Sequence, residues 1–208
     1  MTIGYIADTH WRHRNICSYD NRPFNSVDEM DEAMVSLWNE TVSEDDLTYV
    51  VGDMVWSQKY EEWEELLGRL NGRVFVVKGN HDRTKILEKL AKNKVIEGFS
   101  HQEVISDGPD KVVLNHSPMP FFVNMHQTNW VHLYGHVHVS FDANMMLNMQ
   151  RQISELYLYT PRMYNVGCMM PWMDYRPRTL KEIEEGFKRS DPLKLEFTKN
   201  FSHAERRK

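Results

Sequence analysis

Five short groups of histidine, aspartate and asparagine residues stand directly behind apolar runs of the chain. The groups are Asp8-Thr9-His10, Gly52-Asp53, Gly79-Asn80-His81-Asp82, Asn115-His116 and Gly135-His136-Val137-His138. Imidazole nitrogens, carboxylate oxygens and amide oxygens bind divalent metal ions, and imidazoles also transfer protons. The groups hold too many ligands for one tetrahedral zinc ion, and the chain has too few cysteines for a structural zinc site. They suit two divalent ions that share a bridging carboxylate.

The apolar runs in front of these groups predict the strands that position them. They cover residues 3–7, 47–51, 73–78, 111–114 and 131–134. Short apolar runs of this length are typical of buried strands. Residues two apart in an extended segment point the same way, so Asp8 and His10 can reach one common point. Ligands of open α/β sheets bind beyond the carboxyl ends of the strands, where we expect all five groups to converge.

Helices are predicted between and behind the first three strands. Their expected ranges are residues 27–42, 58–70 and 83–92. The first two show apolar residues at helical spacing, and Ser26 with Glu29 forms a capping box at the start of the first. Alternating strands and helices predict an α/β domain with parallel strands in this half of the chain.

The second half of the chain follows a different pattern. Residues 102–106 and 111–114 flank Asp107-Gly108-Pro109-Asp110, which predicts a hairpin. Residues 163–167 predict a last strand. Thr179 and Glu182 form a second capping box, which opens a terminal helix.

Two segments of the second half lack a clear structural signal. Residues 142–161 are rich in methionine and asparagine at first and show no clear period, so we predict an insertion of uncertain structure. It follows the last group of candidate ligands, and we expect it to wall the pocket and set specificity. The basic tail, residues 199–208, is predicted to be flexible. We expect residues 1–208 to form a single domain.

Composition narrows the functional class. The chain has 208 residues, a size that suits one domain with a substantial core. Its net charge of −5 gives no sign of a global nucleic-acid or membrane surface. The two cysteines favour a reducing compartment. Residues 1–7 lack the pattern of a signal peptide and no apolar run has the length of a membrane span, so we expect neither. We therefore expect a cytoplasmic protein without a membrane partner.

In their order along the chain, the five groups resemble the signature of the calcineurin-like metallophosphoesterase superfamily. That signature reads D-x-H, G-D, G-N-H-[DE], H and G-H-x-H, and all five blocks occur over residues 8–138. The resemblance implies an α/β fold, a β-sandwich of mixed sheets flanked by helices. It also implies a dinuclear metal site at the carboxyl ends of the strands.

The resemblance assigns the candidate ligands to two metal ions. The first ion would be held by Asp8, His10 and His138. The second would be held by Asn80, His116 and His136, and Asp53 would bridge the two. We expect two divalent ions, with Mn²⁺ as the first choice and zinc, iron or nickel as alternatives, because ligands of this kind also bind those metals.

Two residues receive catalytic roles from the same resemblance. Asp53 acts as the bridging carboxylate, and His81 donates a hydrogen bond to the phosphate and a proton to the leaving oxygen. Asp82 either orients His81 or closes the turn. The other histidines, His101, His126, His132 and His203, are interpreted as surface or core residues.

Departures from subfamily patterns narrow the substrate. The residues after Asp53, Met54-Val55-Trp56, differ from the pattern of protein serine/threonine phosphatases, as does Asp82 at the end of its block. The chain is also too short for the additions found on related DNA nucleases. The opening, with His13, Asn15 and Arg22-Pro23-Phe24, is similar to small stand-alone bacterial and phage phosphoesterases.

We therefore expect a metal-dependent phosphodiesterase or phosphatase that acts on a small, nucleotide-like phosphoester. The alternatives are a nuclease acting on DNA or RNA and, from another class, a non-catalytic interaction scaffold on the same fold. Candidates for gripping the phosphate are the basic residues near the motifs. These are Arg12, His13, Arg14, Arg22 and Arg83. The sequence makes no prediction of the oligomeric state.

Overall fold

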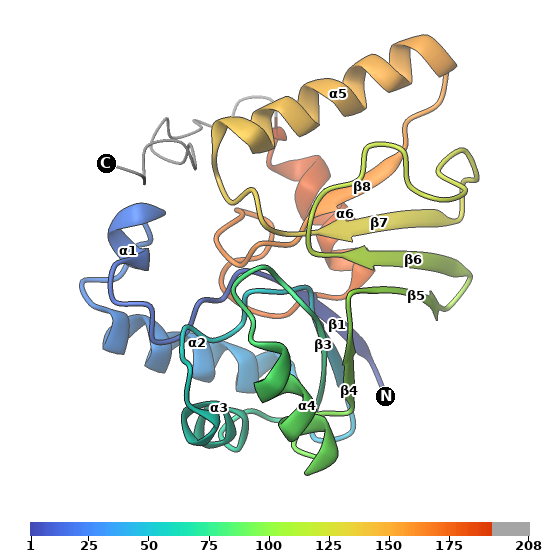
Figure 1. The fold of residues 1–208 in the computed structure, drawn as a ribbon. Helices are drawn as coiled ribbons and strands as arrows, with labels where there is room; N and C mark the ends of the chain where they lie inside the picture. Colours follow the sequence, from blue (N-terminus) through green and yellow to red (C-terminus); the bar gives the residue numbers. More distant parts are fainter. Residues whose placement is uncertain (193–208) are drawn as a thin grey trace.

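Two four-stranded sheets share one apolar core in the computed structural model, which describes residues 1–192 (Figure 1). The first sheet is entirely parallel and contains β1 (Ile3–Ile6), β2 (Leu47–Val50), β3 (Arg73–Val77) and β4 (Gly98–Ser100). The second contains β5 (Gln102–Asp107), β6 (Asp110–Asn115), β7 (Trp130–Tyr134) and β8 (Arg162–Asn165). The predicted fold class, an α/β fold with two sheets flanked by helices, is confirmed.

The second sheet is mixed. Strands β5 and β6 form the predicted antiparallel hairpin, with Asp107 opposite Asp110, and β6, β7 and β8 then pair in parallel. Strand β4 was not predicted, because its three residues are too few to show a period.

Six helices occur within residues 1–192. They are α1 (Ile16–Tyr19), α2 (Val27–Thr41), α3 (Tyr60–Leu67), α4 (Thr84–Lys92), α5 (Phe141–Tyr157) and α6 (Leu180–Arg189). The Ser26 hydroxyl caps α2 by accepting from the Glu29 N–H, but the Glu29 carboxylate accepts from the Asn25 N–H, so only half of the predicted capping box forms. The box of Thr179 and Glu182 at the start of α6 is complete.

Helix α5 forms most of the segment, residues 142–161, that was predicted to be an insertion of uncertain structure. Its buried positions do follow a helical spacing, which the polar residues among them and the exposed apolar ones obscure. They are Ala143, Met146, Leu147, Gln150 and Ile153. The Ser140 hydroxyl caps the helix by accepting from the Asp142 N–H. The helix covers the second sheet, where Met146 belongs to one apolar cluster with Val113.

The two sheets meet through β1 and the segment that follows β8. The Ala7 N–H donates to the Val166 carbonyl at 2.8 Å, and the Cys168 N–H donates to the Ala7 carbonyl at 2.8 Å. This contact brings the carboxyl ends of β1 and β8 together. It sets the loop after β1 beside the loops after β6 and β7, which carry the remaining candidate ligands.

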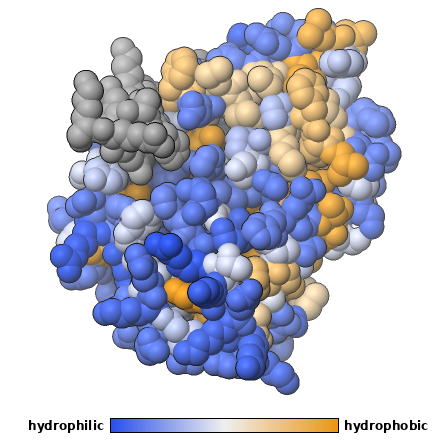
Figure 2. Space-filling view, viewed as in Figure 1, coloured by the Kyte–Doolittle hydropathy of each residue, from blue (hydrophilic) through white to orange (hydrophobic). Residues whose placement is uncertain are grey.

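The surface seen in Figure 2 is largely hydrophilic, with hydrophobic side chains gathered near the far end of α5. Leu156, Tyr157 and Leu158 are exposed at that end. Among the described residues, no helix has the length and apolar character needed to cross a bilayer. The predicted flexible tail, residues 199–208, lies outside the described residues, as does His203.

Candidate metal centre

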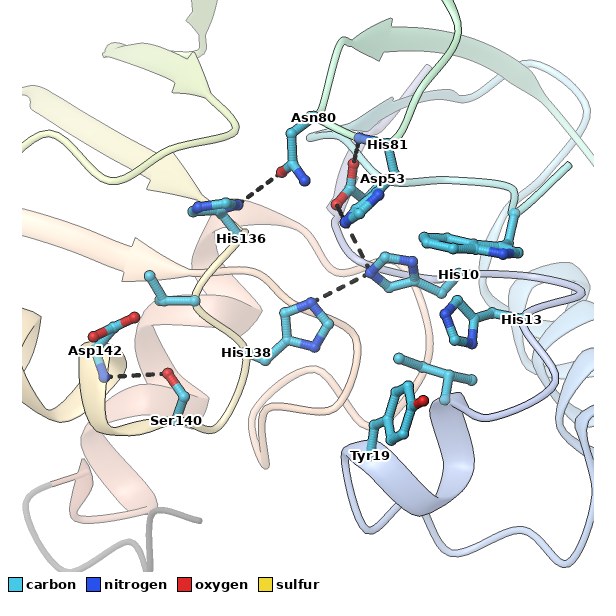
Figure 3. A pocket seen from close by; sticks show the side chains of 13 residues that line it. His10, His13, Tyr19, Asp53, Asn80, His81, His136, His138, Ser140 and Asp142 are labelled. Atoms are coloured by element: carbon cyan, nitrogen blue, oxygen red, sulfur yellow. Dashed lines mark hydrogen bonds and ion pairs between the residues drawn. The ribbon is translucent and has the colours of Figure 1, made fainter. Parts of the chain in front are cut away.

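The seven candidate ligands converge at the carboxyl ends of five strands, from both sheets. Figure 3 shows five of them, His10, Asp53, Asn80, His136 and His138. Donor atoms of Asp8, His10 and His138 lie within 4.8 Å of one another, and so do those of Asp8, Asp53 and His116. Asp8 belongs to both groups, and the Asp53 carboxylate of the second group also approaches His10 of the first. Asp53 Oδ2 is 3.8 Å from His10 Nε2 and 3.3 Å from His116 Nε2.

Three hydrogen-bond acceptors around His116 face one another, and only a positive charge between them can satisfy all three. His116 Nδ1 donates to the Val51 carbonyl at 2.9 Å, so in the neutral imidazole Nε2 is an acceptor. That nitrogen faces two further acceptors, Asn80 Oδ1 at 3.0 Å and Asp53 Oδ2 at 3.3 Å. Three acceptors pointing at one place are satisfied by a proton on the ring or by a cation between them.

The second cluster has the same character. His138 Nδ1 donates to the Asp20 carboxylate at 2.8 Å, and its Nε2 lies 3.3 Å from His10 Nε2. The Asp8 carboxylate is close, with Oδ1 3.6 Å from His138 Nε2. These donor sets, nitrogen and oxygen without sulfur, fit divalent ions such as Mn²⁺, Zn²⁺ or Fe²⁺.

His132 shows how a buried histidine without this role differs. Its Nδ1 also donates to a backbone carbonyl, that of Val113 at 3.0 Å, but its Nε2 accepts from the Met119 N–H at 3.0 Å. Both ring nitrogens are therefore satisfied in the neutral form. Burial lowers the pKa of His132 to about 4. The interpretation of His132 as a core residue agrees with these contacts.

The electrostatics of the pocket also favour a cation. Burial alone would lower the pKa of His116, but the Asp53 and Asp8 carboxylates and the Val51 carbonyl raise it to about 9. Burial lowers the pKa of His10 well below its usual value, and nearby positive groups lower it further, so this ring is neutral. A neutral imidazole is the form that binds metal.

The backbone at the ligands is held in an unusual conformation. Five of the seven candidates have φ between 47° and 72°, in the left-handed region that side-chain-bearing residues rarely adopt. They are Asp8, His10, Asp53, His136 and His138. Each such residue costs on the order of 1 kcal/mol or more, and clusters of them are typical of functional sites.

Two motif glycines make room for ligands from other motifs. Gly52 has φ +88°, and a Cβ on it would overlap with the His116 ring. A Cβ on Gly79 would overlap with the Asp53 carboxylate. These positions therefore require glycine because another strand's ligand lies against the backbone.

A buried ion pair that the sequence did not reveal lies behind His138. The Asp20 carboxylate accepts from His138 Nδ1 and from Arg22 Nη2, both at 2.8 Å. Burial opposes its ionisation, but His138 and Arg22 lower the pKa of Asp20 to about 2. A carboxylate behind a histidine fixes which ring nitrogen faces the metal.

The prediction that Arg22 grips substrate phosphate is wrong. Its guanidinium is fully buried, and its donors are used by Asp20 and by the carbonyls of Asp8 and Thr9, each of these carbonyls at 2.8 Å. Arg22 thus holds the loop that carries the first ligands. No local pattern in the sequence distinguishes an inward-turned arginine from an exposed one.

Asp82 closes the turn, which was one of its two predicted roles. Its oxygens accept from the N–H groups of Gly79 at 2.8 Å, Asp53 at 2.9 Å and Met54 at 3.0 Å. Burial and the neighbouring Asp53 charge raise the pKa of Asp82 to about 6. These bonds tie the loop after β3 to the loop after β2, and so position Asp53.

His81 lies at the mouth of the pocket. Its N–H donates to Asp53 Oδ1 at 2.8 Å, and its half-buried ring lies beside the rings of both Trp56 and His10. Its Nε2 is 4.0 Å from Asp53 Oδ2. The His81 ring therefore lies beside the candidate ligands and belongs to neither metal cluster.

The remaining phosphate-gripping candidates lie at different distances from the pocket. His13 lines it directly. Arg12 turns towards α3 and pairs with Glu65 at 2.7 Å. Arg83 is exposed and lines a neighbouring hollow together with His81. Arg14 is exposed and lines another hollow.

The pocket lining also includes residues that the sequence did not single out. They are Ile16, Tyr19, Trp56, Val137, Ser140 and Asp142. Ser140 and Asp142 stand at the start of α5, so this end of residues 142–161 borders the pocket as expected. His101 and His126 are exposed, which is one of the two settings, surface or core, in which they were interpreted.

Residues 1–151 match the family described as calcineurin-like phosphoesterase. The chain belongs to this family. It is 31% identical over 189 residues to the uncharacterized protein MJ1445 of Methanocaldococcus jannaschii, covering 88% of this chain and 92% of that protein. A solved structure, the protein of unknown function AQ665 from Aquifex aeolicus, aligns with a TM-score of 0.60. It shares 22% identity, covers 88% of this chain and 97% of its own, and supports the fold alone.

Membership in the calcineurin-like phosphoesterase family confirms the predicted resemblance and the predicted enzyme class, a metal-dependent phosphoesterase. It agrees with the clustered carboxylates and imidazoles, which are suited to divalent metal ions. The scaffold alternative would predict lost ligands, and every motif ligand is present.

Proposed function

We propose that the chain hydrolyses a small, nucleotide-like phosphoester, a diester or a monoester, with two divalent ions in the pocket. The observation that carries this proposal is the position of Asp53, whose Oδ2 lies within 4 Å of His10 Nε2 on one side and His116 Nε2 on the other. When bound, such ions polarise the phosphoryl oxygens and lower the pKa of an attacking water.

The residues divide into two sets around Asp53. The inner set would hold one ion through Asp8, His10 and His138. The outer set would hold the other through Asn80, His116 and His136. Asn80 Oδ1 lies 3.0 Å from His116 Nε2 and 2.8 Å from His136 Nδ1, which supports a shared role for these three. Mn²⁺ is our first choice of metal, because these are nitrogen and oxygen ligands without sulfur.

His81 is the proposed general acid. Its backbone N–H is fixed on Asp53, so its ring is held at the pocket mouth, beside the place where the phosphate would lie. A histidine in this position can donate a proton to the leaving oxygen. His13, on the opposite side of Trp56, is proposed to contact the phosphate.

Nuclease activity is the second candidate, and the acidic net charge of −5 makes it the less favoured one.

The two thiols, Cys17 and Cys168, form no disulfide in the described residues and fit a reducing, cytoplasmic compartment.

Metal analysis and a substrate panel test the proposal. Purified protein dialysed against Mn²⁺ should bind about two divalent ions per chain and hydrolyse bis(4-nitrophenyl) phosphate, 4-nitrophenyl phosphate, cyclic nucleotides or dinucleotides. Fewer than about one ion per chain would contradict the dinuclear site. Preferred cleavage of DNA or RNA, with a steep salt dependence, would favour the nuclease instead.

A further inference from the structure

Trp56 is a large apolar side chain left exposed beside the metal pocket. All six tryptophans lie in the described part of the chain, and Trp56 is 41% exposed whereas Trp11, Trp38 and Trp63 are completely buried. Its ring centroid lies 4.1 Å from that of His13 and 4.7 Å from that of His81. The indole therefore stands between two pocket histidines and keeps part of its surface open.

The backbone of Trp56 is well fixed. Its N–H donates to the Trp11 carbonyl at 2.8 Å, and Val55 before it forms a bridge with Trp11. An exposed aromatic ring that is held rigidly at the rim of a site offers a flat contact surface at low entropic cost.

A second cavity lies beside the metal pocket and shares three walls with it. The shared residues are His13, Tyr19 and Trp56. This cavity measures about 680 Å³, which is within the range of small-molecule sites. A ligand whose phosphate lies at the metal centre can therefore extend past Trp56 into a space large enough for a nucleoside.

The charges around this second cavity disfavour a further phosphate. Two arginines line it, Arg12 and Arg14, against three carboxylates, Asp28, Asp31 and Glu62. Arg12 is already paired with Glu65 at 2.7 Å, and Glu62 is paired with Lys59 at 3.0 Å. Burial raises the pKa of Asp31 to about 7, so Asp28 is the lining carboxylate without these restrictions. Carboxylates repel a phosphate and accept hydrogen bonds from hydroxyl and amino groups, which sugars and nucleobases carry.

We propose that this cavity binds the nucleoside part of the substrate and that the base stacks on Trp56. The inference rests on the proposed function, because it assumes a phosphate at the metal centre. The substrate would then be a nucleoside monophosphate or its ester, not a nucleoside polyphosphate. Stacking of one base on an aromatic side chain strengthens binding by about 10-fold or more.

A matched pair of ligands isolates the base. Adenosine 5′-monophosphate and ribose 5-phosphate share the sugar and the phosphate and differ by the base. Their dissociation constants are measured by calorimetry on Mn²⁺-loaded protein, together with quenching of tryptophan fluorescence. We expect the nucleotide to bind about 10-fold more tightly or better.

Variants of Trp56 then test the residue. Trp56→Ala should reduce the nucleotide preference to about one and should leave the bound metal content unchanged, and Trp56→Phe should retain part of the preference. Phe121→Ala serves as the control, since Phe121 is an exposed aromatic that lines neither cavity. It should leave the preference unchanged.

Three results would overturn the inference. They are equal binding of both ligands by the unchanged protein, binding of neither, and an equal loss for both ligands in Trp56→Ala. The last result would mean that Trp56 only supports His13 and His81. Failure of the proposed function is seen separately, as absent metal binding or absent hydrolysis of bis(4-nitrophenyl) phosphate by the unchanged protein.

Discussion

The inner and outer sets of candidate ligands differ in how much of their surface is exposed to solvent. Asp8, His10 and His138 of the inner set are 0%, 4% and 8% exposed. In the outer set only His116 is buried, while His136 is half-buried and Asn80 is exposed.

The supports behind the two sets differ as well. His138 donates to Asp20, which is itself paired with Arg22, whereas His116 donates to the neutral carbonyl of Val51. The inner set contains a carboxylate, Asp8, and the outer set contains none. A buried, charged and hydrogen-bonded set is better organised for a cation than an open, neutral one. We therefore expect the inner ion to bind first and the outer ion to exchange with solution.

The largest effect is expected from removing the negative charge of Asp53, the carboxylate that both ligand sets share. Asp53→Asn keeps the shape of the side chain but removes its negative charge. We expect loss of both ions and loss of detectable phosphoester hydrolysis, measured by metal analysis and with bis(4-nitrophenyl) phosphate. Retention of two ions at normal affinity would show that Asp53 is not a bridging ligand.

A variant of His81 tests proton transfer independently of metal binding. His81→Ala should keep both ions, because the ring belongs to neither set, and should lower kcat by about 10²- to 10⁴-fold on substrates with a poor leaving group. Nitrophenyl esters, whose leaving group needs no proton, should be affected least. Full activity on a poor leaving group would refute the general-acid role.

Asp20 tests whether the support behind the inner set matters. Asp20→Asn should weaken binding of the first ion by about 10- to 100-fold and leave the second nearly unchanged, because the Asn side chain cannot hold His138 in the same way. Calorimetric titration with Mn²⁺ would resolve the two steps. An equal loss at both steps would point to general unfolding of the loop, which circular dichroism would detect.

His132 provides a buried histidine that belongs to neither set. Its pKa of about 4 in the folded protein is below the usual value near 6.5, so the unfolded chain binds the proton more readily in this range. The free energy of unfolding should therefore fall as the pH drops from 6.5 to 4, by about 3 kcal/mol from this group.

The matched variant is His132→Gln, which does not titrate. Its urea-unfolding free energy should depend less on pH between 6.5 and 4 than that of the unchanged protein, while metal content and activity stay the same. An identical pH dependence in both proteins would contradict the buried, neutral state of His132.

Sequence reasoning could predict that the candidate ligands lie close together because each group directly follows an apolar strand. Residues such as Asp8 and Asp53 need only their strand to be recognised for their place to be known. The parallel sheet and the hairpin followed from the same local patterns.

The supports were missed because they depend on contacts between distant parts of the chain. Asp20 and His138 are 118 residues apart, and nothing near Asp20 marks it as a partner. Trp56 was noted only as a departure from another subfamily. The helix α5 was missed because Gln150, a polar residue, occupies one of its buried positions and uses its amide to donate to the Pro161 carbonyl.

The ligands of the centre come from both sheets, since Asp8, Asp53 and Asn80 follow strands of the first and His116 and His136 follow strands of the second. A bound ion would therefore act as a cross-link between the two layers. An ion that binds only the folded chain adds about 2.7 kcal/mol to its stability at 100 times its dissociation constant. The supply of divalent metal would then set the thermal stability of the protein as well as its rate, and a chelator would loosen the packing of one sheet against the other.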